Sequence, residues 1–302
     1  MNLTETSALG VAPQGGLAHV RGDPDAPLSN LTLHALLAAT VARFADRPAV
    51  VFREQGVRWT WRAFGAEVEA LAAGLQLLGL KAGDRLGIWA PNRAEWLLTQ
   101  FATARLGVIL VNINPAYRLS ELDYALTIAG CRAIVTAERL KTSDYLAMLA
   151  TLAPELATCA PGALQAARLP ALQIVIRMGG ARSPGMFNFD DVVAQGRAAL
   201  AAGPLEEVPA LDCHDPINIQ FTSGTTGSPK GATLTHHNVV NNARFIAEAM
   251  RFTEADSLCI PVPLYHCFGM VLAVLACVAT GAAMVFPGES FDAAATLAAV
   301  AE

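Results

Sequence analysis

Short apolar runs alternate with helical patterns along most of this chain, and that alternation is the strongest constraint on its fold. The runs PAVVF, RLGIWA, VILVN, AIVT and IVIR are separated by segments with apolar residues at helical spacing or by turns. Parallel strands need a crossover long enough to hold a helix, whereas antiparallel strands can be joined by a tight turn. The order therefore predicts an α/β protein with mostly parallel sheets flanked by helices.

The same pattern predicts how the chain is divided. Residues 1–30 are expected to form an N-terminal tail, and 31–181 a first α/β subdomain. Residues 182–210 contain Ser-Pro-Gly and few strand-like runs, so they are interpreted as a connecting segment. Residues 211–302 then form a second α/β subdomain.

Several polar residues precede helical patterns and are interpreted as helix starts. Thr60 and Asn92 each stand before a run of helix-forming residues, where a side-chain oxygen can accept a hydrogen bond from a free backbone N–H. His236 and His237 are adjacent and face different directions, so they are also interpreted as residues at a helix start.

Composition excludes several classes of protein. Hydrophobic residues make up 53% of the 302 residues and charged residues 16%, which predicts a globular chain. The net charge is −5 and no run of lysine or arginine occurs, so nucleic acid is not an expected partner. The six cysteines lack CxxC spacing and are interpreted as reduced core residues, and residues 1–16 lack the features of a signal peptide. Together these features predict a cytoplasmic protein, and they do not predict its oligomeric state.

One stretch raises the question of a membrane span. MVLAVLACVATGAAMVF, residues 270–286, is almost entirely apolar. A spanning helix needs about 20 such residues. Thr280 and Gly281 divide this stretch into a helix-length and a strand-length piece, which favours a buried helix followed by a buried strand over a transmembrane segment.

The segment FTSGTTGSPKG, residues 221–231, concentrates glycines, hydroxyls and one lysine after a strand-like run. Glycines allow successive backbone N–H groups to turn onto an anion, and hydroxyls and a lysine add donors and charge. The chain has only three lysines among its 21 basic residues, and one is in this segment. The predicted phosphate-binding residues are Thr222, Ser223, Gly224, Thr225, Thr226, Gly227 and Lys230.

The residues of this segment have two other interpretations. A Walker A loop requires lysine directly before serine or threonine, but Lys230 precedes Gly231, and the segment is expected to join two strands. A flexible turn is also compatible, because clusters of Gly, Ser and Thr are common in turns. The residues alone favour phosphate binding over the turn.

The segment FTSGTTGSPKGATLTHHN resembles the phosphate-loop signature of the adenylate-forming enzymes, which include acyl-CoA synthetases, peptide-synthetase adenylation domains and luciferases. PLYHCFG, residues 263–269, is similar to the next motif of that family. The resemblance covers the chain from about residue 30, and fatty-acyl-CoA synthetases of the medium-chain type are the most similar members. It implies the N-terminal portion of the layered N-terminal domain of these enzymes.

The resemblance also implies a reaction, an ATP-dependent fatty acid–CoA ligation. A carboxylate attacks the α-phosphate of ATP with the help of Mg²⁺, and coenzyme A then takes the acyl group as a thioester. The loop residues named above would hold the β- and γ-phosphates, and His266 would line the junction of the acyl pocket and the adenylate. Alone, a histidine in an apolar run is more often a buried structural residue. No catalytic residue and no metal ligand is predicted.

Motifs that contact adenine and ribose in this family, its hinge and its C-terminal lysine are not found in these 302 residues. The chain is therefore expected to be an N-terminal portion that forms adenylate poorly alone and leaves its last sheet incomplete. Two alternatives remain: an adenylation domain that loads a carrier protein, and a non-catalytic remnant that binds nucleotide. Acyl chain length is not readable, but the apolar run after Phe268 suits an alkyl tail.

Overall fold

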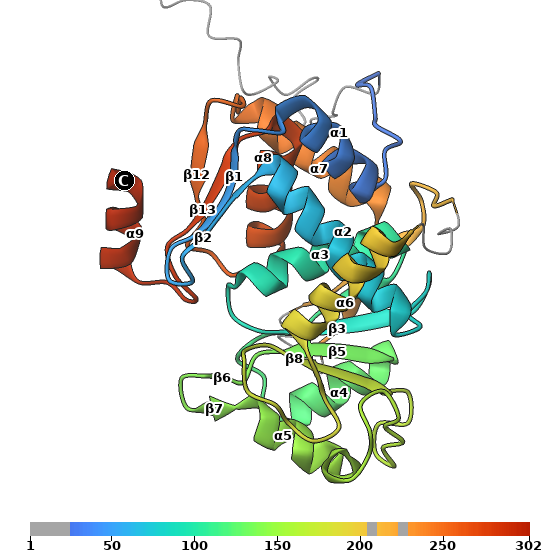
Figure 1. Ribbon diagram of the computed structural model, residues 1–302. Helices are drawn as coiled ribbons and strands as arrows, with labels where there is room; N and C mark the ends of the chain where they lie inside the picture. Colours follow the sequence, from blue (N-terminus) through green and yellow to red (C-terminus); the bar gives the residue numbers. More distant parts are fainter. Residues whose placement is uncertain (1–24, 204–209, 223–228) are drawn as a thin grey trace, which may run out of the picture.

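The computed structural model describes residues 25–203, 210–222 and 229–302. Two main sheets carry the fold, and helices lie between them and on their outer sides (Figure 1). In the larger sheet every neighbouring pair is parallel except β10–β11. Its strands, in spatial order, are β11 (Gly231–Thr235), β10 (Pro216–Phe221), β4 (Ile109–Asn112), β3 (Arg85–Trp89), β5 (Ala133–Thr136), β8 (Ile174–Arg177) and β9 (Phe187–Asn188).

The smaller sheet is also mostly parallel, because only the hairpin β1–β2 is antiparallel. Its strands, in spatial order, are β12 (Ser257–Cys259), β13 (Ala283–Phe286), β1 (Pro48–Phe52) and β2 (Val57–Thr60). A short separate hairpin is formed by β6 (Arg139–Leu140) and β7 (Ser143–Asp144). The predicted α/β class with mostly parallel sheets is confirmed.

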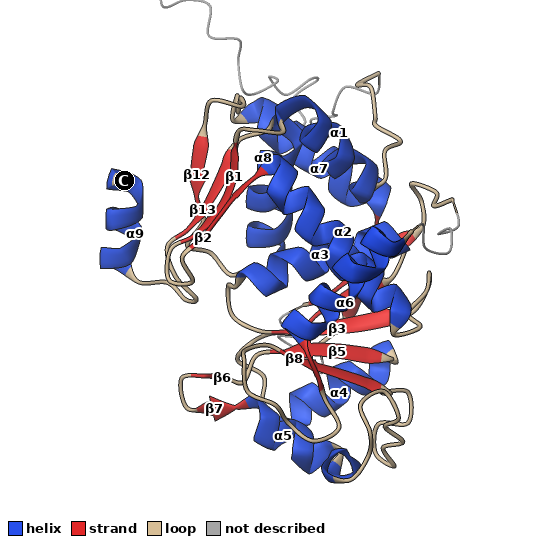
Figure 2. Cartoon of the chain, in the orientation of Figure 1, coloured by secondary structure: helices blue, strands red, loops and turns tan. Residues whose placement is uncertain are grey.

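Helices α1, α2, α3 and α7 lie between the two sheets, whereas α4 and α5 cover the far face of the larger sheet (Figure 2). The α-helices are α1 (Leu33–Phe44), α2 (Trp61–Leu77), α3 (Ala94–Leu106), α4 (Leu119–Ala129), α5 (Tyr145–Leu152), α6 (Phe189–Ala202), α7 (His236–Ala249), α8 (Ala276–Thr280) and α9 (Ala293–Ala301). The chain also forms the 3-10 helix η2 (Pro154–Ala157) and the π-helix η3 (Phe268–Leu275). Thr60 caps α2 as predicted, since its hydroxyl accepts a hydrogen bond from the Ala63 N–H.

Strand pairing crosses the predicted boundary at 182–210. Strands β10 and β11, from the expected second subdomain, extend the larger sheet beside β4. Strand β1, from the expected first subdomain, pairs with β13 in the smaller sheet. The expected connection itself contributes β9 to the larger sheet and contains the whole of α6. The pattern along a chain identifies strands, but it does not say which of them pair across large sequence separations.

Helix α6 packs closely against α2, and glycines make this possible. A Cβ atom at Gly196 would lie 1.9 Å from the carbonyl oxygen of Ala70, and one at Gly74 would lie 2.2 Å from that of Val192. No larger side chain fits at these two positions without moving a helix. The stretch interpreted as a loose connection is therefore part of the helical layer.

The apolar stretch before Phe286 forms a helix and a strand, as predicted. Residues 268–275 form the π-helical turn η3, α8 follows, and Gly281 at φ +86° ends the helix before β13. No helix among the described residues is long and apolar enough to span a membrane.

All six cysteines are free, as predicted, but they do not all lie in the core. Burial raises the pKa of the Cys131 and Cys277 thiols to about 12, so both stay protonated at neutral pH. Cys267, in contrast, is exposed. The interpretation of the cysteines as core residues is therefore wrong for Cys267.

His236 ties the start of α7 to the start of α1. Its side chain is fully buried, and its Nδ1 accepts a hydrogen bond from the Leu33 N–H at 3.0 Å. Burial lowers the pKa of His236 to about 4, although the nearby Asp215 carboxylate opposes this shift and His34 adds to it. His236 is the first residue of α7, in agreement with its interpretation as a helix start.

The lowered pKa of His236 predicts a loss of stability in mild acid. Because the unfolded chain takes up this proton near pH 6.5 and the folded chain only near pH 4, stability is complete above pH 6.5 and falls as the pH decreases. Between pH 7.5 and 5 this histidine alone is expected to lower the free energy of unfolding by about 2 kcal/mol. Urea unfolding of His236→Gln is expected to lack this part of the pH dependence. The exposed His214, changed to Gln as a control, is expected to retain it; equal pH dependence in both variants would contradict the assignment.

Candidate active site

The predicted phosphate loop connects the antiparallel strands β10 and β11. Phe221 pairs with Gly231, and the next two residues close the neck of the hairpin. The Thr222 N–H donates to the Lys230 carbonyl oxygen at 2.9 Å, and the Lys230 N–H donates to the Thr222 hydroxyl at 3.3 Å. Both residues are exposed, and among the described residues no carboxylate pairs with Lys230. The neck therefore presents a free ammonium group to solvent.

The other predicted loop residues, Ser223, Gly224, Thr225, Thr226 and Gly227, lie outside the described residues. The expectation that the loop joins two strands, and not a strand and a helix, is confirmed. The loop leaves the carboxyl end of β10, which runs parallel to β4 with Gln220 opposite Asn112. In open α/β sheets the carboxyl ends of parallel strands are where ligands bind.

A second loop reaches the same edge from the smaller sheet, and buried amides hold it there. The Asn112 side chain donates to the Tyr265 carbonyl oxygen at 3.0 Å and accepts from the Asn218 side chain at 2.9 Å. Both asparagines are almost fully buried. Asn92 donates to the Val262 carbonyl oxygen at 2.9 Å and accepts from the Leu264 N–H at 2.8 Å.

Asn92 does not cap a helix, which corrects the prediction. Helix α3 begins at Ala94 with Arg93 at the capping position, and Arg93 makes no side-chain capping bond. The Asn92 side chain is occupied by the loop that carries Pro263 to His266, so a long-range contact replaces the local cap. The sequence therefore does not reveal that Asn92, Asn112 and Asn218 position this loop. Asparagines inside apolar strand runs, as in LVNIN and INIQF, were the available signal.

His266 is exposed and its ring is fixed by the following turn. Its Nδ1 accepts a hydrogen bond from the Phe268 N–H at 3.1 Å, so the neutral ring carries its proton on Nε2. Its carbonyl oxygen accepts from the N–H groups of Gly269 and Met270, both at 3.0 Å. The alternative of a buried structural histidine is therefore excluded, and Nε2–H remains available as a donor.

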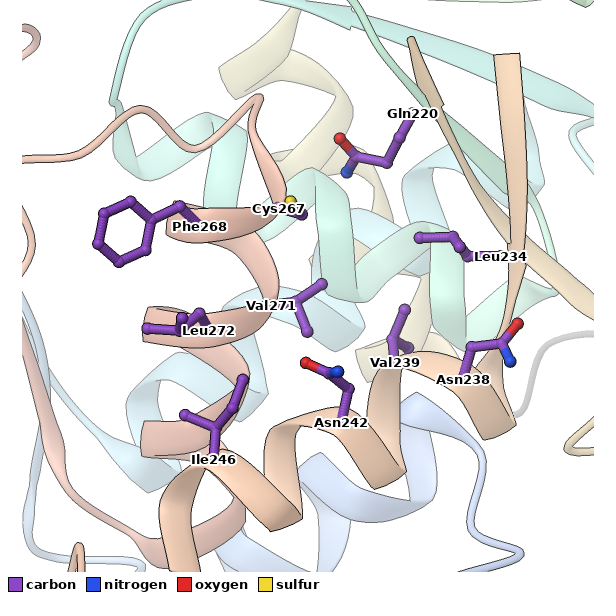
Figure 3. Close-up of a pocket in the computed structure, with 10 residues that line it drawn as sticks. All are labelled: Gln220, Leu234, Asn238, Val239, Asn242, Ile246, Cys267, Phe268, Val271 and Leu272. Atoms are coloured by element: carbon purple, nitrogen blue, oxygen red, sulfur yellow. The ribbon is translucent and has the colours of Figure 1, made fainter. Parts of the chain in front are cut away.

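An apolar groove of about 460 Å³ opens beside this loop, between β10, β11, α7 and η3 (Figure 3). Val271 of η3 and Val239 of α7 point toward each other across it, and Gln220 lies at its end nearest the sheet. None of its described lining residues is charged. The lining residues are Gln220, Leu234, Asn238, Val239, Asn242, Ile246, Cys267, Phe268, Val271 and Leu272.

One group of described residues has metal-ligand spacing. The side-chain donor atoms of Asp212, Cys213 and His214 lie within 4.8 Å of one another. They precede β10, whereas the loop follows it, so they lie at the opposite end of the strand from Thr222. The Asp212 carboxylate accepts the backbone N–H of His214, which accounts for part of this clustering. This group does not supply a metal to the phosphate loop.

Comparison with known proteins relates this geometry to one family. The sequence profile of the family described as AMP-binding enzyme matches residues 37–302. The zebrafish protein (Danio rerio) named medium-chain acyl-CoA ligase ACSF2, mitochondrial, is 45% identical over 285 residues, which are 94% of this chain and 47% of that protein. The human protein of the same name is 42% identical over 293 residues, covering 95% and 48%. The chain thus spans about half the length of the curated relatives it matches.

Solved structures agree with this relationship. The ATP-bound structure of MatB from Rhodopseudomonas palustris is 25% identical, with a TM-score of 0.68 over 91% of this chain and 48% of that one. The resemblance to the N-terminal portion of medium-chain fatty-acyl-CoA synthetases is confirmed.

The prediction of a cytoplasmic protein is contradicted by these relatives. The zebrafish, mouse and human proteins are all named as mitochondrial. The prediction failed because free cysteines indicate a reducing environment and do not distinguish one reducing compartment from another.

Three features agree: the glycine- and hydroxyl-rich segment between two strands, the layered α/β fold, and the family profile over residues 37–302. The segment that led to the resemblance lies inside the matched range. This chain belongs to the AMP-binding enzyme family.

Proposed function

We propose that this chain is the part of an ATP-dependent fatty acid–CoA ligase that binds the phosphates of ATP and the acyl group. The carboxyl end of β10 is the observation that carries the proposal. Gln220 lines the apolar groove, and Thr222, two residues later, lies at the neck of the phosphate loop. A carboxylate at the mouth of the groove would therefore lie next to the phosphates. Because the chain spans about half of its relatives, the complete activity is proposed for a protein that contains it.

The triphosphate of ATP is proposed to bind at the β10–β11 hairpin. The ammonium group of Lys230 would neutralise β- and γ-phosphate oxygens as a point charge, and the Thr222 hydroxyl would donate a hydrogen bond to them. Ser223, Gly224, Thr225, Thr226 and Gly227 are proposed to supply backbone N–H groups and hydroxyls. Mg²⁺ would be held mainly by phosphate oxygens and water, as is usual for this ion, with the exposed Thr222 hydroxyl as an oxygen donor on the chain.

His266 is proposed to contact the junction between the acyl carboxylate and the adenylate. Its Nε2–H is the free donor on a ring held by the Phe268 N–H, and the next residue, Cys267, lines the groove. In the second step the acyl carbonyl oxygen would gain negative charge as the thiolate attacks, and a preorganised donor at that oxygen would stabilise this charge. Coenzyme A would then receive the acyl group as a thioester.

The acyl substrate is proposed to be a fatty acid, as in the medium-chain ligases that the chain resembles. A groove with apolar walls and no charged lining residue favours an alkyl chain. An amino acid carries an ammonium group that needs a carboxylate or several acceptors, and the described lining offers no carboxylate. This observation favours the ligase over a peptide-synthetase adenylation domain.

Two titrations test the proposal on the chain itself. Octanoate is expected to bind, and alanine is not; ATP with Mg²⁺ is expected to bind independently of octanoate. Absence of ATP binding by a folded chain would overturn the nucleotide site, and preference for alanine would favour the adenylation domain. Exchange of labelled pyrophosphate into ATP that depends on octanoate then tests the reaction in a protein that contains this chain.

A large side chain placed in the groove is expected to remove the dependence of acid affinity on chain length. Each buried methylene adds about 0.8 kcal/mol, so affinity is expected to rise about fourfold per methylene from butanoate until the groove is filled. Val271→Trp places an indole in the groove and is expected to flatten this series, as measured by calorimetry. Val300→Trp, on the exposed face of α9, serves as the control and is expected to leave the series unchanged. An unchanged series in the Val271 variant would place the acyl chain elsewhere.

A further inference from the structure

Gln100 is a buried polar residue that no hydrogen bond among the described residues explains. It lies in α3, is 3% exposed, and neither its Nε2 nor its Oε1 has a hydrogen-bond partner among the described residues. A primary amide buried without partners destabilises the folded state, so native proteins rarely leave both of its polar atoms unpaired. A partner of Gln100 that is not a side chain or backbone group of the described chain would account for this position.

Asn218 of β10 offers a second unpaired atom nearby. Its Nδ2 donates to the Leu110 carbonyl oxygen at 3.0 Å and to the Asn112 side-chain oxygen at 2.9 Å. Two acceptors on one side fix the orientation of this amide, which leaves Oδ1 on the other side. That Oδ1 is buried and has no partner among the described residues.

Gln100 and Asn218 line the same small cavity between the larger sheet and the helices. Its volume is about 10 Å³, close to the volume that one water molecule requires. The other lining residues are apolar, among them Leu110, Ile217 and Leu275. A buried water needs two to four polar partners, and the two amides supply three unpaired atoms.

Met270 separates this cavity from the acyl groove. It lines the cavity, and its sulfur lies 3.4 Å from the Asn112 Nδ2 and 3.6 Å from the Nε2 of Gln220, a residue of the groove. Val239 lines both spaces. The side chains of Met270 and Val239 therefore lie between the cavity and the groove.

We propose that one structural water occupies this cavity and bridges the Gln100 amide to Asn218 Oδ1. Gln100 is then a positioning residue for the active-site loop, residues 260–267 between β12 and η3. The bridge completes a series of hydrogen bonds from α3 through Asn218 and Asn112 to the Tyr265 carbonyl oxygen, one residue before His266. The water itself does not depend on the proposed function, whereas the effect on substrate rests on it.

A crystal structure of the chain that resolves ordered solvent tests the water directly. We expect one water within about 3.2 Å of the Gln100 amide and of Asn218 Oδ1. A cavity without solvent density, or a Gln100 side chain that turns to a protein partner, would overturn the proposal.

In solution, the sign of the Tm change in a Gln100 variant distinguishes a hydrated cavity from a dry one. Gln100→Met keeps the length of the side chain and removes its polar atoms. If water bridges the two amides, the variant leaves Asn218 Oδ1 unpaired and its Tm is expected to fall by a few degrees. If the cavity is dry, removal of an unpaired amide is expected to raise the Tm, which would contradict the proposal. Gln165→Met, at an exposed position, is the control for the same chemical change and is expected to leave the Tm unchanged.

Ligand binding tests the positioning role. Loss of one hydrogen bond in the series is expected to weaken octanoate binding by about threefold to tenfold in Gln100→Met, while binding of ATP with Mg²⁺ stays unchanged. Equal weakening of both ligands would indicate a general structural defect and contradict positioning. If the unmodified chain does not bind octanoate, the proposed function fails, whereas the crystallographic water and the sign of the Tm change still decide the water site.

Discussion

Replacement of Lys230 by methionine is expected to weaken the binding of ATP with Mg²⁺ by about 10- to 100-fold. Lys230 lies exposed at the neck of the β10–β11 hairpin, and its ammonium group has no carboxylate partner among the described residues. A hydrogen bond to a charged group contributes about 1.5–3 kcal/mol, which corresponds to this loss of affinity. Calorimetric titration measures it, and the difference between the two proteins is expected to shrink at high salt.

Lys81→Met is the matched control for Lys230→Met. Lys81 is one of the other two lysines, is also exposed, and follows α2 at a distant turn. Its replacement is expected to leave ATP affinity unchanged, and octanoate affinity is expected to be unchanged in both variants. Equal ATP affinity in the Lys230 variant and the unmodified chain would remove the hairpin from the nucleotide site.

Gly269→Ala is expected to displace the active-site loop and to destabilise the fold by about 3 kcal/mol. A Cβ atom at this position would lie 2.3 Å from the carbonyl oxygen of Pro263 and 2.8 Å from its carbonyl carbon. Both are backbone atoms of the turn before His266, and Asn92 holds that turn at its neighbour Leu264. The overlap therefore cannot be relieved by rotation of a side chain, and the turn or η3 must move.

Thermal unfolding and octanoate titration together measure the effect of Gly269→Ala. The Tm is expected to fall and octanoate affinity to decrease, because Phe268, Val271 and Leu272 of η3 line the groove. Gly180→Ala is the control, since a Cβ atom there meets no atom within 4 Å. Wild-type stability and affinity in the Gly269 variant would show that the turn is not packed as described.

The elements of this fold were largely predictable, but their pairing was not. Runs such as VILVN and AIVT are apolar at almost every position because they become inner strands of a parallel sheet with both faces covered. Their pairing could not be predicted because β1 and β13 join across most of the chain, and local periodicity carries no information on such contacts. The need for glycine at the α2–α6 contact could not be predicted either, since a close approach depends on how two helices pack.

The candidate site was predictable where a motif carries its chemistry. The hydroxyl- and glycine-rich segment and His266 were both identified from the sequence, and the strand–loop–strand geometry of the first is confirmed. The amides of Asn112, Asn218 and Gln100 were not identified, and Asn92 was assigned to a helix cap, because single buried polar residues resemble exposed ones until the packing is known. These amides hold the loop between β12 and η3 at the edge of the larger sheet. The sequence therefore predicts the residues expected to contact substrate, but not the residues that position them.

The central claim is that the carboxyl end of β10 brings the phosphates of ATP and an alkyl carboxylate together. The most direct test is a crystal structure of the chain with ATP, Mg²⁺ and octanoate. The account predicts a triphosphate in contact with Thr222 and Lys230, and an alkyl chain between α7 and η3 with its carboxylate near His266. A triphosphate bound away from the β10–β11 hairpin, or octanoate outside the groove, would contradict it.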